Sequence, residues 1–392
     1  MRKLLAAALL VLACPPMADA ARLERGPYLE SMTKDMVTAR FRVDTSSPAW
    51  FSYGAAPDCE RFLTPVQAVK EHKVQLFGLL PDTTHCYRLY LPADQSTGVY
   101  KAFEGNFTTF RDETKPYFSF MAFGDSGSGS EEQYELAAQM DKFRPDFVVH
   151  TGDVLSDGED ADADDQYFEP YAGLLARTPF FLALGNHDYG RDVKNSAGKG
   201  FLKTNFTPFH SVPYTGLPPH YYFFDDANAR FFVLDVNAFS GAKFAPDLAP
   251  GSKQYKWLEK YLAKASDKTW KFVVVHQPLY STGAHPEVEG QLQALEPLFL
   301  KYKVDLVLQG HDHDYERTFP VKEGMTDEAS GIIYLTLGGG GNQLYIQRRN
   351  EDWSAKFLPV YHFAVFNIKE KNLKMSVYNK AGEEIDTLEI QK

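Results

Sequence analysis

Two patterns of hydrophobic and polar residues divide the chain. From about residue 21 to residue 111, short segments alternate apolar and polar side chains and are separated by Pro, Gly, Asp and Ser. Side chains of a β-strand point alternately to opposite faces, so this pattern is typical of strands with one buried face. The strands that it predicts span residues 36–43, 49–54, 72–79, 85–92 and 102–110. We therefore predict a small antiparallel β-sandwich over residues 21–112.

The rhythm changes after residue 112, where fully apolar runs alternate with amphipathic segments. Apolar strands that alternate with helices indicate an α/β domain whose sheets are covered on both faces. The predicted strands span residues 117–123, 146–151, 180–184, 230–236, 271–276, 304–309 and 332–338, and the predicted helices span 131–143, 167–178, 252–265 and 290–302. Residues 362–390 return to alternating strands, which we expect to complete a second sheet. The sequence thus predicts an α/β domain over residues 113–392.

The composition adds size and charge to this picture. The chain has 392 residues, of which 44% are hydrophobic, and a formal charge of −11. That is ample material for one large domain and a smaller one. Because there is no Lys/Arg-rich run, we expect no nucleic-acid partner. An acidic protein can still bind a phosphorylated compound where bound metal supplies the positive charge.

The first twenty residues, MRKLLAAALLVLACPPMADA, have the features of an export signal. They combine a basic start, an apolar stretch too short to span a bilayer and small residues before Ala21. We predict a signal peptide over residues 1–20 and a secreted or periplasmic protein without a transmembrane segment. An alternative remains, because VLAC at residues 11–14 resembles a bacterial lipoprotein cleavage site, which would leave Cys14 as a lipid-anchored first residue.

Cys59 and Cys86 are the cysteines that remain after cleavage at residue 20. In an oxidising compartment such a pair forms a disulfide, and two buried free thiols are the alternative. Neither cysteine lies in a motif with a supporting histidine, so neither is expected to be a nucleophile.

Residues that can bind a metal follow five of the predicted strands. In open α/β sheets, sites form from the loops beyond the carboxyl ends of the strands. Each motif alone is weak, since GD is a common turn and GNHD can cap a helix. Their recurrence behind one strand after another indicates one shared site. The candidates are Asp125 in GDSG, Asp153 in GDVLS, Asn186, His187 and Asp188 in GNHD, His276 and His285 in HQPLYSTGAH, and His311 and His313 in GHDHDYER.

The donor types indicate which ions would bind. Carboxylates, one amide oxygen and imidazoles, with no thiolate among them, suit Zn, Mn and Fe. One ion does not need so many donors, whereas a pair does. His311 and His313 are two residues apart, so in an extended segment their rings point to the same side.

The motif order GDSG…GDVLS…GNHD…VVVHQP…GHDHDYER resembles that of the calcineurin-like metallophosphoesterases. The preceding β-sandwich and the HDYER ending are similar to the purple acid phosphatase branch, and GLLPDTTHCYRLY at residues 78–90 resembles a corner of fibronectin type III domains. The resemblance implies a four-layer α/β/β/α fold. It also implies a binuclear centre that hydrolyses a small phosphorylated substrate, a phosphate monoester, by attack of metal-activated hydroxide on phosphorus. Two alternatives stay open, namely a phosphodiesterase with the same centre and a non-catalytic secreted binding protein with a degenerate site.

The same resemblance implies a role for each candidate residue. The first ion is held by Asp125, Asp153 and His313. Asp153 bridges to the second ion, which is completed by Asn186, His276 and His311. His187 serves as the acid for the leaving group, Asp188 orients its ring, and His285 faces the substrate.

Ser156 departs from the family pattern, because purple acid phosphatases have a tyrosine ligand at this position. A phenolate favours ferric iron and gives the purple colour, and serine does not ionise comparably. We therefore predict a colourless protein whose first site is less selective for ferric iron, with Fe, Zn or Mn as the bound ions.

Three further segments carry expectations that the fold can test. The acidic run at residues 156–166 is expected to be a solvated loop, because like charges repel. The glycines of LGGGGNQ at residues 337–343 either let backbone approach the site or only turn the chain. Ser126 in GDSGSGS is not expected to be a nucleophile, because the G-x-S-x-G spacing is missing.

Overall fold

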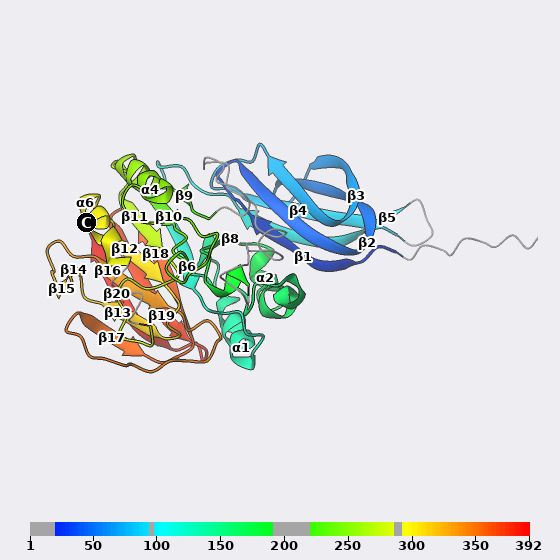
Figure 1. The fold of residues 1–392 in the computed structure, drawn as a ribbon. Coiled ribbons are helices and arrows are strands. Elements are labelled where there is room, and N and C mark those ends of the chain that lie inside the picture. The colour runs from blue at the N-terminus through cyan, green and yellow to red at the C-terminus, as the bar shows by residue number, and fades with distance from the viewer. Residues whose placement is uncertain (1–19, 94–97, 191–219, 286–291) are drawn as a thin grey trace, which may run out of the picture.

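The computed structural model describes residues 20–93, 98–190, 220–285 and 292–392. The predicted signal peptide, with Cys14, lies outside these residues except for Ala20. Figure 1 shows a unit built of strands beside a larger unit of sheets and helices.

The first unit has five antiparallel strands, in which β2 pairs with β1, β3 and β4, and β5 pairs with β4. They are β1 (Leu23–Glu30), β2 (Met36–Ala55), β3 (Arg61–Phe77), β4 (Thr84–Pro92) and β5 (Val99–Thr108). The two strands predicted at 36–43 and 49–54 are one strand, because irregular pairing with β3 around Ser47 lets β2 pass through the Ser–Pro segment without ending. Cys59 and Cys86 form a disulfide that ties the β2–β3 turn to β4.

The larger unit contains two large sheets. The first has the strand order β17-β13-β16-β12-β11-β10-β9 and the second has β20-β19-β18-β6-β7-β8. The antiparallel strands at the end of the chain thus complete the sheet that β6 begins, as predicted. The strands are β6 (Tyr117–Phe123), β7 (Phe147–His150), β8 (Phe180–Leu182), β9 (Tyr222–Asp226), β10 (Ala229–Val233), β11 (Trp270–Val274), β12 (Leu306–Gln309), β13 (Tyr315–Thr318), β14 (Val321–Lys322), β15 (Met325–Thr326), β16 (Ile333–Leu337), β17 (Ser354–Leu358), β18 (His362–Lys369), β19 (Asn372–Asn379) and β20 (Glu384–Gln391).

Alternation of side chains along the strands produces four layers. On β11, Phe272 and Val274 pack into the core between the two sheets, whereas Val273 packs on the helical side with α4 (Lys253–Ala263) and α6 (Glu296–Lys301). On β6, Phe120 faces the core between the sheets, and its neighbour Met121 packs with α1 (Glu131–Met140) and α2 (Ala172–Leu175). Helices therefore cover the outer face of each sheet, which confirms the predicted α/β/β/α fold.

Two predicted helices are shorter than the sequence pattern indicates. The segment 167–178 forms a π-helical turn (Asp164–Phe168) and the single turn α2. The segment 290–302 forms a 3-10 turn (Gln293–Leu295) followed by α6 among its described residues. Proline is the physical reason in both, because Pro170 and Pro297 lack the amide hydrogen that a helix interior needs and so fall between or at the start of helical turns.

The acidic loop, residues 156–166, is not the solvated loop that its charges predict. The guanidinium of Arg25 on β1 is fully buried and pairs with Asp164 at 2.7 Å and Asp160 at 3.2 Å. Arg42 on β2 also contacts Asp160, at 2.8 Å. Positive charge from the first unit thus offsets part of the repulsion within the loop and anchors it. Because the loop begins three residues after Asp153, this contact connects the first unit to the predicted site.

Candidate metal centre

The predicted ligands lie where parallel strands of the two sheets end. Asp125 follows β6, Asp153 follows β7 and Asn186 follows β8, all in one sheet, while His276 follows β11 and His311 follows β12 in the other. Strands β6, β7 and β8 are parallel to one another, as are β11 and β12, so each sheet presents these loops at one edge. The sequence prediction that the motifs meet at the strand ends agrees with this placement.

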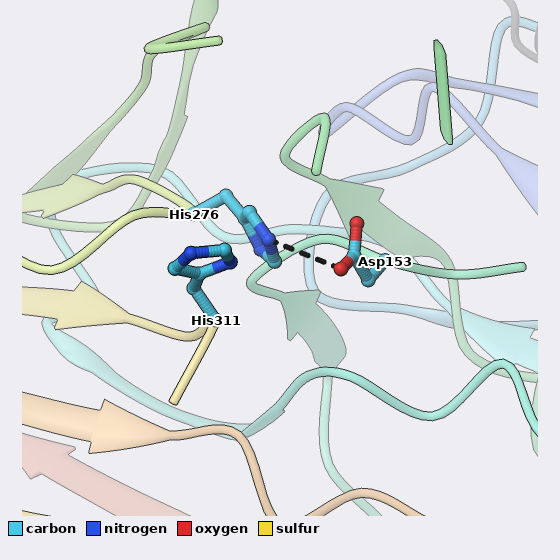
Figure 2. Close-up of side chains that lie close together, drawn as sticks. All are labelled: Asp153, His276 and His311. Atoms are coloured by element: carbon cyan, nitrogen blue, oxygen red, sulfur yellow. Dashed lines mark ion pairs between the residues drawn. The ribbon is translucent and has the colours of Figure 1, made fainter. Parts of the chain in front are cut away.

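Three of these residues form a compact cluster in Figure 2. Asp153, His276 and His311 each offer a ligand atom, and these atoms lie within 4.8 Å of one another. The Nε2 atom of His276 is 3.2 Å from Oδ2 of Asp153 and 3.0 Å from Oδ1 of Asn186. Two oxygens and a ring nitrogen that converge in this way need a proton or a cation between them.

The other two predicted ligands adjoin this cluster. Asp125 is fully buried and accepts the backbone N–H of His311 at 3.0 Å. The Nε2 atom of His313 lies 3.7 Å from Oδ1 of Asp125. All six predicted ligands are therefore gathered in one place, although their function as ligands stays a prediction.

Hydrogen bonds to the far side of two rings decide which nitrogen faces the centre. Nδ1 of His276 donates to the carbonyl of Thr151 at 3.0 Å, and Nδ1 of His313 donates to the carbonyl of Gln343 at 2.8 Å. Each ring therefore presents Nε2 to the carboxylates, which is the arrangement that metal-binding histidines adopt in proteins. The residues present fit a metal centre.

The carboxylates of this site influence its imidazoles strongly. Burial lowers the pKa of His276, but the charges of Asp153 and Asp125 outweigh it and raise the pKa to about 9. Burial and the neighbouring His276 lower the pKa of His311 to about 3. Burial raises the pKa of Asp125 well above its usual range. Burial also acts to raise the pKa of Asp153, but the charge of His276 and its hydrogen bond outweigh it and hold that pKa well below its usual range. The carboxylates of Asp153 and Asp125 thus stabilise a positive charge at the position of the His276 ring.

The backbone at three of the predicted ligands adopts an uncommon conformation. Asp125, Asp153 and His311 have φ angles of 58°, 53° and 69°, in the left-handed region that residues other than glycine seldom occupy. Such conformations persist only where the surrounding structure imposes them, and they gather at functional sites.

Two glycines allow the loops to approach one another. A Cβ atom at Gly185 would lie 2.1 Å from Oδ1 of Asp153, and one at Gly338 would lie 2.0 Å from the carbonyl of Asp312. At Gly338 the same atom would also come within 2.9 Å of Oδ2 of Asp125. The glycines of LGGGGNQ therefore bring backbone against the site rather than only turning the chain.

His187 lies beside the predicted ligand Asp153, and its ring is held by a residue other than Asp188. The backbone N–H of His187 donates to Asp153 at 2.8 Å, and its ring is 55% exposed with Nε2 4.0 Å from Asp153. The ring is held by the carbonyl of Ser156, which lies 2.7 Å from Nδ1. The expectation that Asp188 orients this ring is wrong.

Asp188 is instead a buried anchor for the loops. Its carboxylate accepts the backbone N–H groups of Asp153 and Gly185 at one oxygen and those of Val154 and Leu155 at the other. Burial and the charge of Asp153 raise the pKa of Asp188 to about 7. The group acts through the backbone of a predicted ligand, and among the described residues the contacts of its carboxylate are with these amides.

His285 lies at the site with a partner that the sequence did not reveal. Its Nδ1 is 2.7 Å from the buried carboxylate of Asp312, and its ring is 4.2 Å from that of His311. Asp312 also accepts hydrogen bonds from Ser281 and from the backbone of Ala284. The carboxylate between the two histidines of the motif thus serves to hold His285, and its spacing alone gave no sign of this.

Tyr345 is a second residue that the sequence did not identify. Its ring stacks on His313 with a centroid separation of 4.2 Å and lies 5.4 Å from the ring of His285. Burial raises its pKa, followed by the charges of Asp125, Asp312 and Asp153, so the phenol lies within reach of those carboxylates. The sequence feature that could have identified Tyr345 is its position four residues after the glycine run.

Ser156 points away from the centre. Its Oγ accepts a hydrogen bond from Nε2 of Gln166 at 3.0 Å, and its N–H donates to Oε1 of the same side chain at 2.8 Å. The position of the family tyrosine therefore contributes only its backbone carbonyl, to His187.

Ser126 is excluded as a nucleophile on structural grounds. It is fully buried, with Oγ 2.9 Å from Nε2 of His150. Because Nδ1 of His150 accepts the N–H of Gly152 at 3.2 Å, the ring carries its hydrogen on Nε2 and donates to Ser126. A general base needs a lone pair at that atom, so the pair is structural.

Two sheets between layers of helices, with metal-binding residue types at the strand ends, define a metallophosphoesterase fold. The family model of the calcineurin-like phosphoesterases matches residues 118–315, just over half of the chain. The chain belongs to the calcineurin-like phosphoesterase family.

Curated relatives and solved structures agree with this assignment. The chain is 29% identical over 248 residues to Fe(3+)-Zn(2+) purple acid phosphatase 12 of Arabidopsis thaliana, covering 57% of this chain and 50% of that protein. It is 30% identical over 220 residues to probable inactive purple acid phosphatase 24 of the same plant, covering 51% and 35%. The structure of purple acid phosphatase PPD1 from yellow lupin (Lupinus luteus) seeds superposes with a TM-score of 0.77 at 21% identity, over 96% of this chain and 75% of that one. At this identity the likeness shows the fold, and the chain spans half or less of the length of the two curated relatives.

Among the described residues, none of the helices combines the length and the apolar character needed to cross a membrane.

Proposed function

We propose that the chain is a metal-dependent phosphoesterase that hydrolyses phosphate monoesters at a binuclear centre. The observation that carries the proposal is the convergence of Asp153, Asn186 and His276 on one point, with Asp125, His311 and His313 beside them. Bound metal ions would supply positive charge for the phosphoryl oxygens and activate water for attack on phosphorus. The family match and the purple acid phosphatase relatives support the same chemistry.

The contacts are consistent with the division of ligands between two ions. Nε2 of His313 lies 3.7 Å from Asp125, and these two residues would hold the first ion with Asp153. His276 contacts both Asp153 and Asn186, and it would hold the second ion with Asn186, His311 and the bridging Asp153. Asp153 is the carboxylate common to both groups, which suits a bridging ligand.

His187 and His285 would serve the leaving group and the phosphoryl oxygens. Each ring has an oxygen acceptor at Nδ1, the carbonyl of Ser156 for His187 and the carboxylate of Asp312 for His285. Each ring therefore keeps a hydrogen at Nδ1 and directs Nε2 away from that partner. A protonated Nε2 can give its hydrogen to the departing oxygen.

Purification with metal analysis tests the proposal. We expect close to two metal ions per chain and turnover of p-nitrophenyl phosphate above that of bis-p-nitrophenyl phosphate, with nucleotides and phytate as further substrates. Asp153→Ala and His311→Ala should abolish turnover and lower the metal content, while Asp247→Ala, an exposed aspartate, should leave both unchanged. A protein without stoichiometric metal, or variants that lose activity but keep both ions, would contradict the proposal. Faster turnover of the diester would redirect it to phosphodiesterase activity.

We also propose that the mature protein is exported. The disulfide between Cys59 and Cys86 supports this location, because such bonds persist in oxidising compartments. Fractionation of cells with and without residues 1–20 tests it. Retention of the full-length chain in the cytoplasm, with reduced cysteines, would contradict export.

A further inference from the structure

One segment after the glycine run is attached to three of the site loops. The N–H and side-chain amide of Asn342 donate to the carbonyl of Asp125 at 3.2 and 3.0 Å. The N–H of Tyr345 donates to the carbonyl of His313 at 3.0 Å, and that of Arg348 donates to Thr282 in the His285 loop at 2.8 Å. Residues 342–348, the bridging segment, are thus held against loops from both sheets.

The bridging segment places the ring of Tyr345 between two site histidines. The ring lies nearly parallel to that of His313, with an interplanar angle of 11°, and meets the ring of His285 at 64°. Stacking on His313 leaves only a narrow range of orientations for the phenol. The side chain is half-buried, so one part of it packs and another part stays open to a ligand.

The ring of Tyr345 therefore lies against His313, a predicted metal ligand, and near His285, which is predicted to face the substrate. A phosphoryl group at the proposed centre would lie among these residues. A neutral phenol carries one O–H donor, which can bond an anionic oxygen there.

Ser156, at the position of the family tyrosine, bonds Gln166 and supplies no hydroxyl to the site. We infer that Tyr345 is a substrate-contacting residue whose phenol donates a hydrogen bond to the phosphoryl group. This inference rests on the proposed function.

The test compares the metal-loaded full-length protein with its Tyr345→Phe variant, which keeps the ring and its stacking but removes the hydroxyl. Inorganic phosphate is the probe, titrated by calorimetry, and metal content is measured on the same samples. A hydrogen bond to a charged group contributes about 1.5–3 kcal/mol, which corresponds to about 10- to 100-fold in affinity. We expect phosphate binding and kcat/KM for p-nitrophenyl phosphate to fall by about that factor, with metal content and thermal stability unchanged.

Tyr90→Phe on β4 of the first unit is the matched control and should behave as the wild type. Unchanged phosphate affinity in Tyr345→Phe would overturn the inference and leave the proposed function intact. An absorbance band above 500 nm in the iron-loaded wild type that Tyr345→Phe lacks would also overturn it, because the phenol would then be a metal ligand. A wild-type protein that takes up both ions but binds no phosphate would contradict the proposed function, and the inference with it.

Discussion

Replacement of Asp188 by asparagine separates the anchoring role that the structure shows from the ring-orienting role that the sequence predicted. Each carboxylate oxygen accepts two backbone N–H groups, and the four amides belong to the loops that carry Asp153 and Asn186. Asparagine keeps one of the two oxygens and puts an NH₂ group in place of the other. Two backbone donors then face a donor.

The cost follows from the number of bonds lost. A hydrogen bond to a charged group contributes about 1.5–3 kcal/mol, so the loss of two predicts a destabilisation of about 3–6 kcal/mol. That is a large fraction of a total stability of roughly 5–15 kcal/mol. Because one of the lost or weakened bonds fixes the backbone of Asp153, metal affinity should fall together with stability.

Thermal unfolding and metal content of Asp188→Asn, measured at pH 8 to keep the wild-type carboxylate ionised, check this prediction. We expect a decrease in Tm on the order of 10 °C and loss of at least one ion. Asp247→Asn is the control, because Asp247 is exposed and accepts one backbone N–H, from Ala249. An Asp188→Asn protein with wild-type Tm and metal content, but an altered pH profile of kcat, would refute the anchoring role and restore the ring-orienting one.

Three further predictions concern the ion pair between Arg25 and Asp164, the buried carboxyl group of Asp226 and the absorbance of the iron-loaded protein. Arg25→Met removes a buried partner of Asp164 and should lower the free energy of unfolding, measured with urea, by about 2–4 kcal/mol. The loss is smaller than for a fully buried ion pair because the carboxylate of Asp164 can rehydrate. A change under about 0.5 kcal/mol would show that the contact does not contribute to stability. Burial and the charge of Asp146 raise the pKa of Asp226 to about 7, so the folded state binds this proton more tightly and stability should fall as pH rises from about 4 to 7. Asp226→Asn should flatten that part of a Tm–pH curve, and an unchanged slope would contradict the assignment. The iron-loaded protein should show no absorbance above 500 nm, because Ser156 supplies no phenolate, and a purple protein would contradict this.

The positions of the candidate ligands were predictable because they depend on local pattern. An apolar strand followed at once by a short polar motif places Asp125 or His276 at a sheet edge whatever the rest of the chain does. The parallel order of the strands then brings those edges together. In the same way, the alternation of apolar and polar residues in β18 to β20 was sufficient to predict that these strands complete the second sheet.

The partners of those residues could not be read from the sequence, because they depend on contacts between distant segments. Arg25 and Asp164 are 139 residues apart, and His285 and Asp312 are 27 apart. Local charge density alone favoured a solvated acidic loop, and adjacency alone favoured Asp188 as the partner of His187. Contacts with distant segments produce a different result in both places. Pro170 divides the predicted helix 167–178 although the apolar pattern continues past it.

The left-handed backbone of Asp125, Asp153 and His311 creates a trade-off between the stability of the fold and the chemistry of the site. Holding a residue with a Cβ in that conformation costs on the order of 1 kcal/mol, and glycine would relieve it. Substitutions that make the polypeptide more robust at these positions would therefore delete the very side chains that chemistry requires. Random drift or engineering that rewards heat resistance alone would be expected to erase the centre before it disturbs the sheets.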